Sequence, residues 1–374
     1  MATVTTPSPS AFTSERFLAD YKKTADSLGA SYSESTVQGT LSSFDGSFEE
    51  GTVIWRSTSR PNDKLNYRFY LRNRLDTVGL AIKAGYIEAS NPMARLATCW
   101  SNLFDGDTAQ WCDLDPEEGV AKTWIFLKGQ RSVDHILDAA EVPDSARAHR
   151  ATFHSLGLKL VHFAAVAHHG GTMNIYFTVP GPISEAQAAA YTNLAGCKPP
   201  TPAEFEDLRK YLPTRRFVFA VTIDYNTGKI KRVAFYALNI PGGELPATAN
   251  ESLRKFFAEA PSYDKQQTRN IAWSYGNGDS KYMKGEASYT GELEDWVHNV
   301  RNPVTEKLAL LLEDVCTLLQ PLILRLPRTL LSTCTLAVAD KSESPPYYRS
   351  ARILPMKTDE ALLMKPCQWS IIAS

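Results

Sequence analysis

The chain contains repeated pairs of short segments in which apolar and polar side chains alternate, the pattern of half-buried β-strands. The pairs are Thr52–Ser59 with Lys64–Tyr70, Thr108–Leu114 with Ala121–Leu127, Lys159–Ala167 with Thr172–Val179, Arg216–Asp224 with Lys229–Leu238, and Thr268–Tyr275 with Tyr282–Tyr289. Successive pairs begin roughly fifty to sixty residues apart, a period that indicates an architectural repeat.

The links within the pairs have the composition of tight turns. Asn226-Thr227-Gly228 and His169-Gly170-Gly171 are rich in residues that accept a positive φ. Helical periodicity between and before the pairs predicts helices over Glu15–Leu28, Ser184–Leu194, Pro202–Tyr211 and Glu251–Ala258, and we expect Ser14 to be the N-cap of the first.

Each strand has one apolar face and one face of polar and aromatic side chains. In Thr172–Val179, for example, Met173 and Ile175 alternate with Asn174 and Tyr176. Helices must bury an apolar stripe, and the apolar strand faces are the available partners. The polar face then either meets solvent in an open sheet or, if the hairpins close, lines a lumen. We predict an α+β fold, a ten-stranded antiparallel β-barrel surrounded by helices, with a solvent-sheltered lumen.

Composition excludes several classes of partner. The 374 residues carry 40 basic and 41 acidic side chains, a net charge of −1. This balance argues against nucleic acid or a membrane surface as partner, so any anion is bound by a few focused cations. The most apolar stretch, Leu308–Ala339, is interrupted by charges, and the start lacks a secretory signal. We expect a cytoplasmic, monomeric protein whose partners are small molecules.

Cations gather on the polar strand face in one alternation phase. They are Arg56, Arg68, Lys122, Arg232 and Lys284. Such a set amid aromatic rings indicates an anion site, in the first place a diphosphate, with Asn174 and Tyr282 as neutral donors. The alternative is a solvated face with scattered salt bridges. The acids around the second pair, Asp113 among them, are expected to be solvated.

Rings and one acid complete the candidate site. Trp124 and Tyr176 share the phase and would exclude water and stabilise a cation through their π-faces. His162 either contacts an aromatic substrate or is a satisfied barrel histidine. Glu286, the single acid of this set, either balances charge or takes up a proton from a bound substrate. No Asp-Asp pair and no zinc-ligand spacing occurs, so we predict no metal site.

Five segments, in their order and spacing, resemble the soluble aromatic prenyltransferases of the ABBA or PT-barrel family, in the branch of the clorobiocin and naphterpin enzymes. They are Leu65–Arg68, Lys122–Trp124, Met173–Phe177, Thr227–Arg232 and Tyr282–Glu286, within a region of resemblance from Phe12 to Ile323. The resemblance implies transfer of a dimethylallyl group from its diphosphate to a phenolic or dihydroxynaphthalene-like ring. It also implies that Lys122, Asn174, Arg232 and Lys284 bind the diphosphate, and that His162 and Glu286 lie near the aromatic acceptor.

The chain departs from the family pattern at the positions of the metal ligand and a nearby residue. Members that require Mg²⁺ carry an acidic ligand where this chain has Asn66 and a small hydroxyl residue where it has Arg68. The resemblance therefore implies the metal-independent subgroup, without a cofactor. A further family lysine is replaced around Gly170 and a tyrosine by Ala220, which leaves the preferred diphosphate open.

The predicted organisation is a flexible segment over residues 1–11, a barrel domain over residues 12–325 and an irregular extension over residues 326–374. Alternatives to the favoured activity are prenylation at nitrogen or oxygen, a geranyl donor, and a non-catalytic barrel that carries a small aromatic ligand.

Overall fold

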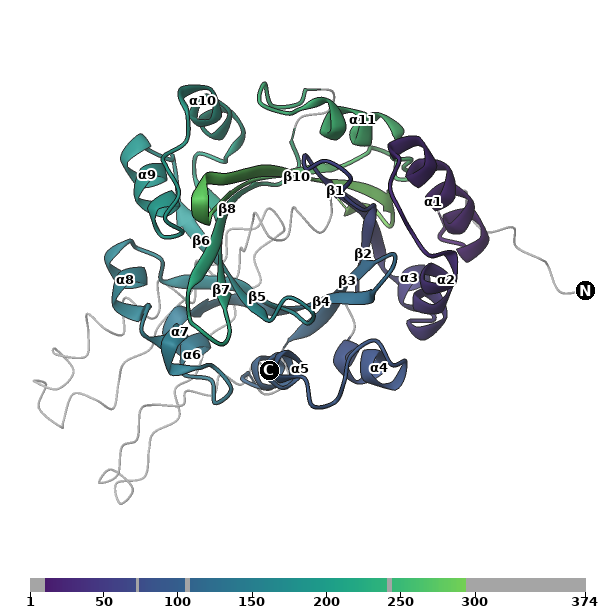
Figure 1. The fold of residues 1–374 in the computed structure, drawn as a ribbon, viewed down its shortest axis with the longest axis horizontal. Helices are drawn as coiled ribbons and strands as arrows, with labels where there is room; N and C mark the ends of the chain where they lie inside the picture. Colours follow the sequence, from purple (N-terminus) through teal and green to yellow (C-terminus); the bar gives the residue numbers. More distant parts are fainter. Residues whose placement is uncertain (1–10, 72–73, 105–107, 241–243, 294–374) are drawn as a thin grey trace, which may run out of the picture. The chain divides into compact units, whose positions relative to one another are not determined.

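The computed structural model describes residues 11–71, 74–104, 108–240 and 244–293. Ten strands close into an antiparallel barrel in the order β1-β10-β9-β8-β7-β6-β5-β4-β3-β2 (Figure 1). They are β1 (Thr52–Thr58), β2 (Asn66–Tyr70), β3 (Ala109–Asp115), β4 (Gly119–Ser132), β5 (Leu160–Ala167), β6 (Thr172–Pro180), β7 (Arg216–Asp224), β8 (Ile230–Ala237), β9 (Arg269–Gly276) and β10 (Ser280–Thr290). Pairing of β1 with β10 closes the sheet, so the predicted barrel is confirmed.

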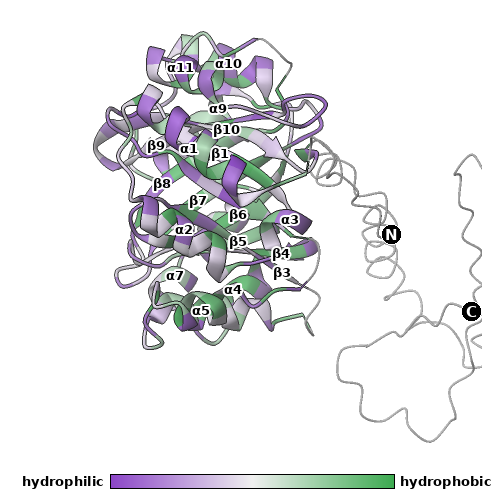
Figure 2. Ribbon diagram, turned by 90° about the vertical axis from the view of Figure 1, so that its right-hand side faces the viewer, coloured by the Kyte–Doolittle hydropathy of each residue, from purple (hydrophilic) through white to green (hydrophobic). Residues whose placement is uncertain are grey.

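Helices surround the barrel on its outer side (Figure 1). They are α1 (Ser14–Leu28), α2 (Glu34–Ser43), α3 (Ser47–Glu50), α4 (Thr77–Lys83), α5 (Pro92–Ser101), α6 (Val133–Leu137), α7 (Asp144–Arg147), α8 (Arg150–Ser155), α9 (Glu185–Asn193), α10 (Pro202–Tyr211) and α11 (Glu251–Glu259). Figure 2 shows hydrophilic segments along the outer helices α1, α10 and α11. No helix in the described ranges is both long and apolar enough to cross a bilayer.

The apolar strand faces pack against these helices, as the alternation predicts. Trp55 of β1 and Phe17 of α1 are fully buried, and their rings stack with centroids 4.8 Å apart. Leu253 and Phe257 of α11 cover β10 in the same way. Complete burial of one such side chain contributes about 1.5–3 kcal/mol, so the layer between strands and helices carries the stability of the fold.

The helix boundaries agree with the sequence prediction in some places and differ in others. Helix α10 has the predicted bounds, which a capping box at Thr201 and Pro202 in its first turn fix. The first helix is capped by Thr13 rather than Ser14, because the Thr13 side chain accepts from the Arg16 amide. The prediction for residues 326–374 lies outside the described residues.

Gly285 provides a test of the strand–helix contact. A Cβ at this position would approach Leu253 Cδ1 to 2.7 Å and Phe257 Cζ to 2.8 Å. We expect Gly285→Ala to lower the free energy of unfolding by about 1–3 kcal/mol, since α11 must shift outward. Gly170→Ala is the control, because the nearest atom to its added Cβ, Ala167 Cβ, lies at 3.7 Å. Equal losses in urea denaturation of the two variants would contradict this packing.

Candidate active site

Charged side chains of β1 to β3 and β10 form one connected group inside the barrel. Arg56 Nη1 donates to Asp113 Oδ2 at 2.9 Å, and Arg68 Nε donates to the other carboxylate oxygen of Asp113. Arg68 Nη2 also contacts Glu286 Oε1 at 3.1 Å. Antiparallel register produces this group, because Arg68 lies opposite Asp113 and Arg56 lies opposite Glu286.

Asp113 corrects the expectation that the acids of the second strand pair are solvated. Asp113 is only 2% exposed, because β3 continues to Asp115 and the Asp113 side chain points into the barrel. Burial alone would raise the pKa of Asp113, but the charges of Arg68 and Arg56 outweigh burial and hold that pKa well below its usual range. Glu286 is therefore not the single acid among the lumen cations.

Polar side chains of β6 to β8 form a second group. Thr222 Oγ1 donates to Asn174 Oδ1 at 2.8 Å, and Arg232 Nη2 lies 3.4 Å from the same hydroxyl. Thr222 stands opposite both Asn174 and Arg232 in the sheet, which explains the contact. Lys284 Nζ on β10 donates to Tyr236 Oη at 3.3 Å. Asn174, Arg232 and Lys284, predicted from the sequence as one set, therefore line one wall.

The cations divide into paired and unpaired ones. Arg56 and Arg68 contact carboxylates directly, whereas within the described residues Lys122, Arg232 and Lys284 form no ion pair. We call these five cations with Asp113 and Glu286 the charge cluster. Its five basic side chains and two carboxylates leave a formal excess of three positive charges.

The pKa values of the two lysines in the charge cluster reflect burial and the crowding of positive charges. Burial first, and then the neighbouring arginines, lower the pKa of Lys122 to about 7, against the opposing effect of Asp113. Burial, followed by Arg232, Lys122 and Arg56, lowers the pKa of Lys284 well below its ordinary value. An anion bound among these groups would relieve the repulsion, so the charge cluster has the electrostatics of an anion site.

Aromatic rings border the charge cluster. The Trp124 and Tyr176 ring centroids are 4.5 Å apart, and the Arg68 guanidinium lies 4.4 Å from the centroid of Trp124. Tyr282 lies against the cations, with the guanidinium of Arg232 5.7 Å from its ring centroid. These rings are the ones that the alternation phase selects.

Trp111 is a lumen ring that the sequence analysis does not single out. It stacks on Phe126 with centroids 5.3 Å apart and planes inclined by 20°. It stands opposite Trp124, in the same alternation phase as Asp113. The alternation of side chains along Thr108–Leu114 is the signal that could have identified Trp111, because Trp124 and Lys122 stand opposite Trp111 and Asp113.

His162 reaches the lumen through an irregularity of β5. Phe163 stands opposite Tyr176 and Val161 opposite Phe177, so a register shift leaves His162 as an extra residue. Its ring stacks on Phe126 at 5.3 Å with an interplanar angle of 21°. Burial lowers its pKa to about 4, so the imidazole is neutral at neutral pH. The register shift, and not simple alternation, places His162 beside the lumen rings, and its contact with an aromatic acceptor stays a prediction.

Both carboxylate oxygens of Glu286 are held in place. Oε1 faces Arg68, and Oε2 accepts from Asn270 Nδ2 at 3.2 Å. The residue is 8% exposed, which removes it from bulk water. A fixed carboxylate beside aromatic rings can orient a hydroxyl group and accept a proton from it or from a ring.

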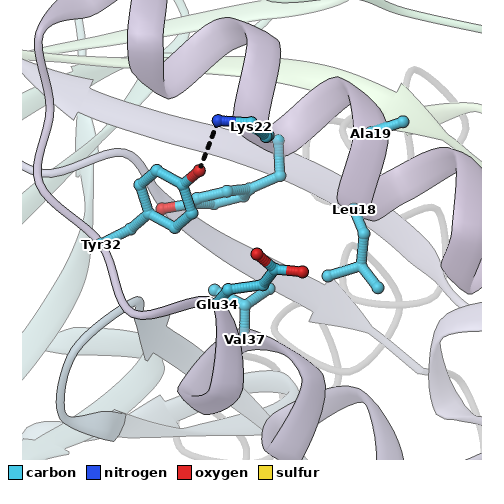
Figure 3. Close-up of a pocket in the computed structure, with 7 residues that line it drawn as sticks. Leu18, Ala19, Lys22, Tyr32, Glu34 and Val37 are labelled. Atoms are coloured by element: carbon cyan, nitrogen blue, oxygen red, sulfur yellow. Dashed lines mark hydrogen bonds between the residues drawn. The ribbon is translucent and has the colours of Figure 1, made fainter.

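A separate pocket of about 160 Å³ lies outside the barrel, between α1 and α2 (Figure 3). Leu18, Ala19 and Val37 supply part of its lining, and Lys22 Nζ donates to Tyr32 Oη across it at 3.4 Å. None of the site residues predicted from the sequence lines it. The candidate chemistry therefore belongs to the lumen and not to this pocket.

Comparison with known proteins identifies similar chains. The model of the family described as "Aromatic prenyltransferase Orf2" matches residues 12–300. An aromatic prenyltransferase of Arthroderma otae is 83% identical over 274 residues, which cover 73% of this chain and 87% of that protein. The 4-hydroxyphenylpyruvate 3-dimethylallyltransferase of Streptomyces niveus is 36% identical over 285 residues, covering 76% and 87%. The crystal structure of the prenyltransferase PriB in its apo form aligns with a TM-score of 0.48 and 13% identity, over 73% of this chain and 95% of that one.

Removal of Asp113 tests the charge cluster. Asp113→Asn leaves Arg56 without an ion-pair partner and buried Arg68 with Glu286 alone, and we expect the free energy of unfolding to fall by about 3–5 kcal/mol. Asp144→Asn is the control, because the Asp144 side chain is 95% exposed in its pair with Arg147. That variant should unfold like the parent protein in urea titrations. A loss for Asp113→Asn as small as that of the control would show that the arginines do not depend on Asp113.

The lowered pKa of Lys122 predicts pH-dependent anion binding. Below pH 7 Lys122 is charged in the empty protein, and above it anion binding must draw a proton onto the amine. The affinity for methyl diphosphate should therefore fall between pH 7.5 and 9, by at most about tenfold per pH unit for each proton taken up. This window lies above the phosphate pKa of about 6, so the ligand's own ionisation stays constant.

Calorimetry in buffers of different ionisation enthalpy measures this proton uptake. Lys122→Met should bind more weakly and show a shallower pH dependence. Lys64→Met, which removes a lysine paired with Asp115 at the end of the barrel, should keep the parent slope. A parent affinity that is constant across the window would refute the coupling.

Proposed function

Because the chain belongs to the aromatic prenyltransferase Orf2 family and is a transferase of prenyl groups, we propose that it transfers dimethylallyl from dimethylallyl diphosphate to an electron-rich ring. We expect a phenolic or dihydroxynaphthalene-like acceptor and attack by a ring carbon. The observation that carries this proposal is the charge cluster in a closed lumen, with a formal excess of three positive charges when both lysines are protonated. An alkyl diphosphate carries about three negative charges above its last pKa, which matches that excess.

The unpaired cations are the expected ligands of the diphosphate. Lys122, Arg232 and Lys284, with the amide of Asn174, converge from four strands on one part of the lumen. When the allylic C–O bond breaks, both bonding electrons leave with the diphosphate, and these cations stabilise the growing negative charge. Arg56 and Arg68 add positive charge from the neighbouring wall.

Aromatic rings are the expected shield of the allylic cation. Trp124 and Tyr176 are buried and in mutual contact next to the cations. Their π-faces stabilise positive charge, and the closed wall excludes water that would otherwise capture the cation. Both effects favour transfer to the ring over hydrolysis.

Glu286 is the expected base. The ring carbon of the acceptor forms a bond to C1 of the allyl group, and the proton at that carbon then passes to the Glu286 carboxylate as aromaticity returns. Neutral His162, stacked on Phe126, helps to position the acceptor. The name of the relative from Streptomyces niveus, which combines a dimethylallyl group with a 4-hydroxyphenyl acceptor, supports the proposed donor and the proposed class of acceptor.

We further propose that the reaction needs no metal ion. Asn66 and Arg68 stand where the resemblance places a metal ligand and its small neighbour, and the guanidinium of Arg68 supplies positive charge there. A carboxamide is a poorer Mg²⁺ ligand than a carboxylate. Among the described residues no group of three or more His, Cys, Asp or Glu side chains could hold a metal ion.

Incubation with labelled dimethylallyl diphosphate and a panel of phenols, with and without EDTA, tests the activity. We expect a prenylated phenol in both conditions. Transfer that EDTA abolishes would refute metal independence. Methyl diphosphate binding without transfer to any acceptor would favour a barrel that only carries an aromatic ligand.

Glu286→Gln tests the assignment of the base. We expect kcat to fall by about 10²–10⁴, the usual contribution of a general base, while the Kd of methyl diphosphate changes much less. Glu244→Gln is the control, since that carboxylate pairs with Lys210 at the surface. Equal losses in kcat and in diphosphate affinity would identify Glu286 as an electrostatic support of the charge cluster instead.

A further inference from the structure

The indole N–H of Trp124 differs from those of the other described tryptophans. The other four donate hydrogen bonds: Trp55 to Pro261 O at 2.9 Å, Trp100 to Ile136 O at 3.1 Å, Trp111 to Leu71 O at 2.9 Å and Trp273 to Thr248 Oγ1 at 3.4 Å. Trp124 is 7% exposed, and its Nε1 is buried without a partner. Within the described chain it is the one tryptophan whose donor is unused.

An unused donor in this place requires an explanation. The indole nitrogen can only donate, and a buried donor without an acceptor costs about 1–3 kcal/mol. The ring cannot easily turn to find one, because Arg68 lies 4.4 Å from its centroid, Lys122 Nζ 5.3 Å and the Tyr176 ring 4.5 Å. A ring held by its neighbours, with its N–H unsatisfied, is suited to a ligand that brings an acceptor.

A second unpaired ring nitrogen lies nearby. His162 is 4% exposed, and its Nε2 has no partner. Both rings contact Phe163, with centroid distances of 6.4 Å from Trp124 and 4.7 Å from His162. Two unsatisfied polar groups thus border one aromatic side chain on the β4–β5 wall.

We propose that Trp124 Nε1–H donates to a carbonyl or carboxylate oxygen of the aromatic acceptor, and that the enzyme selects acceptors that carry such an oxygen beyond the prenylated ring. This inference rests on the proposed function. His162 offers the second polar contact to the same substituent. The diphosphate already balances the charge excess of the lumen, so a neutral carbonyl satisfies the donor without adding a buried negative charge.

Three acceptors with insulated side groups separate the effect of the oxygen from ring electronics. They are 4-hydroxyphenylacetone with a ketone, 4-hydroxyphenylacetate with a carboxylate, and 4-isobutylphenol as the isostere of the ketone without oxygen. Trp124→Phe keeps an aromatic ring and removes the N–H. We expect it to lower kcat/KM for the ketone by about 10- to 100-fold more than for 4-isobutylphenol, the usual effect of one buried hydrogen bond. The carboxylate arm shows whether the site also accepts the charged oxygen.

Trp100→Phe is the matched control, because Trp100 lies on α5 outside the barrel and its N–H bonds to Ile136. It should leave the ratio between acceptors at the parent value. Equal losses for ketone and isostere in Trp124→Phe would overturn the inference and make Trp124 a packing ring, with water at its N–H. If Trp124→Phe does not fold, His162→Phe must show the same selective loss for the inference to stand.

Binding separates this inference from the proposed function. Calorimetric titration of 4-hydroxyphenylacetone and 4-isobutylphenol into the protein saturated with methyl diphosphate requires no turnover. Weakened binding of the ketone alone in Trp124→Phe supports the hydrogen bond even if no acceptor is prenylated. Turnover without any difference between ketone and isostere refutes the hydrogen bond and leaves the prenyl transfer intact.

Discussion

The mutual repulsion of basic side chains enclosed in one lumen is the interaction on which the rest of the site depends. Asp113 and Glu286 relieve part of it by binding Arg68 from two sides, with Arg56 on the far oxygen of Asp113. The repulsion that remains acts on Lys122 and Lys284. Burial and the neighbouring positive charges lower the pKa values of both lysines. This repulsion among the basic side chains is the reason why we expect the charge cluster to bind an anion.

The barrel tolerates this unfavourable interior because its stability is located elsewhere. Large apolar side chains between strands and helices, such as Trp55 against Phe17, are fully buried on the outer side of the sheet. The wall is closed through the pairing of β1 with β10, so the lumen cannot relax by opening an edge. The apolar layer between strands and helices stabilises the fold, and the inner face of the sheet holds the repelling charges. The barrel can therefore carry a charged site without losing its structure.

The cations inside the lumen differ in whether they form an ion pair with a carboxylate, and this difference indicates different functions. Cations with carboxylate partners set the field, whereas unpaired Lys122, Arg232 and Lys284 are available to a ligand. The same distinction applies to neutral donors, where Trp124 alone among the described tryptophans keeps a free N–H. An allylic diphosphate and an oxygen-bearing aromatic acceptor together would satisfy both kinds of unpaired group.

The sequence alone determined the strands, the inward phase of Lys122, Asn174, Arg232 and Lys284, and the bounds of α10. Side-chain alternation with a period of two and capping at Thr201 are local properties of the backbone, so they can be read without tertiary contacts. Only the tertiary structure decided that Asp113 meets Arg56 and Arg68, and that a register shift brings His162 onto Phe126. These contacts depend on which strands become neighbours and on where pairing slips by one residue, and closure of the whole barrel fixes both.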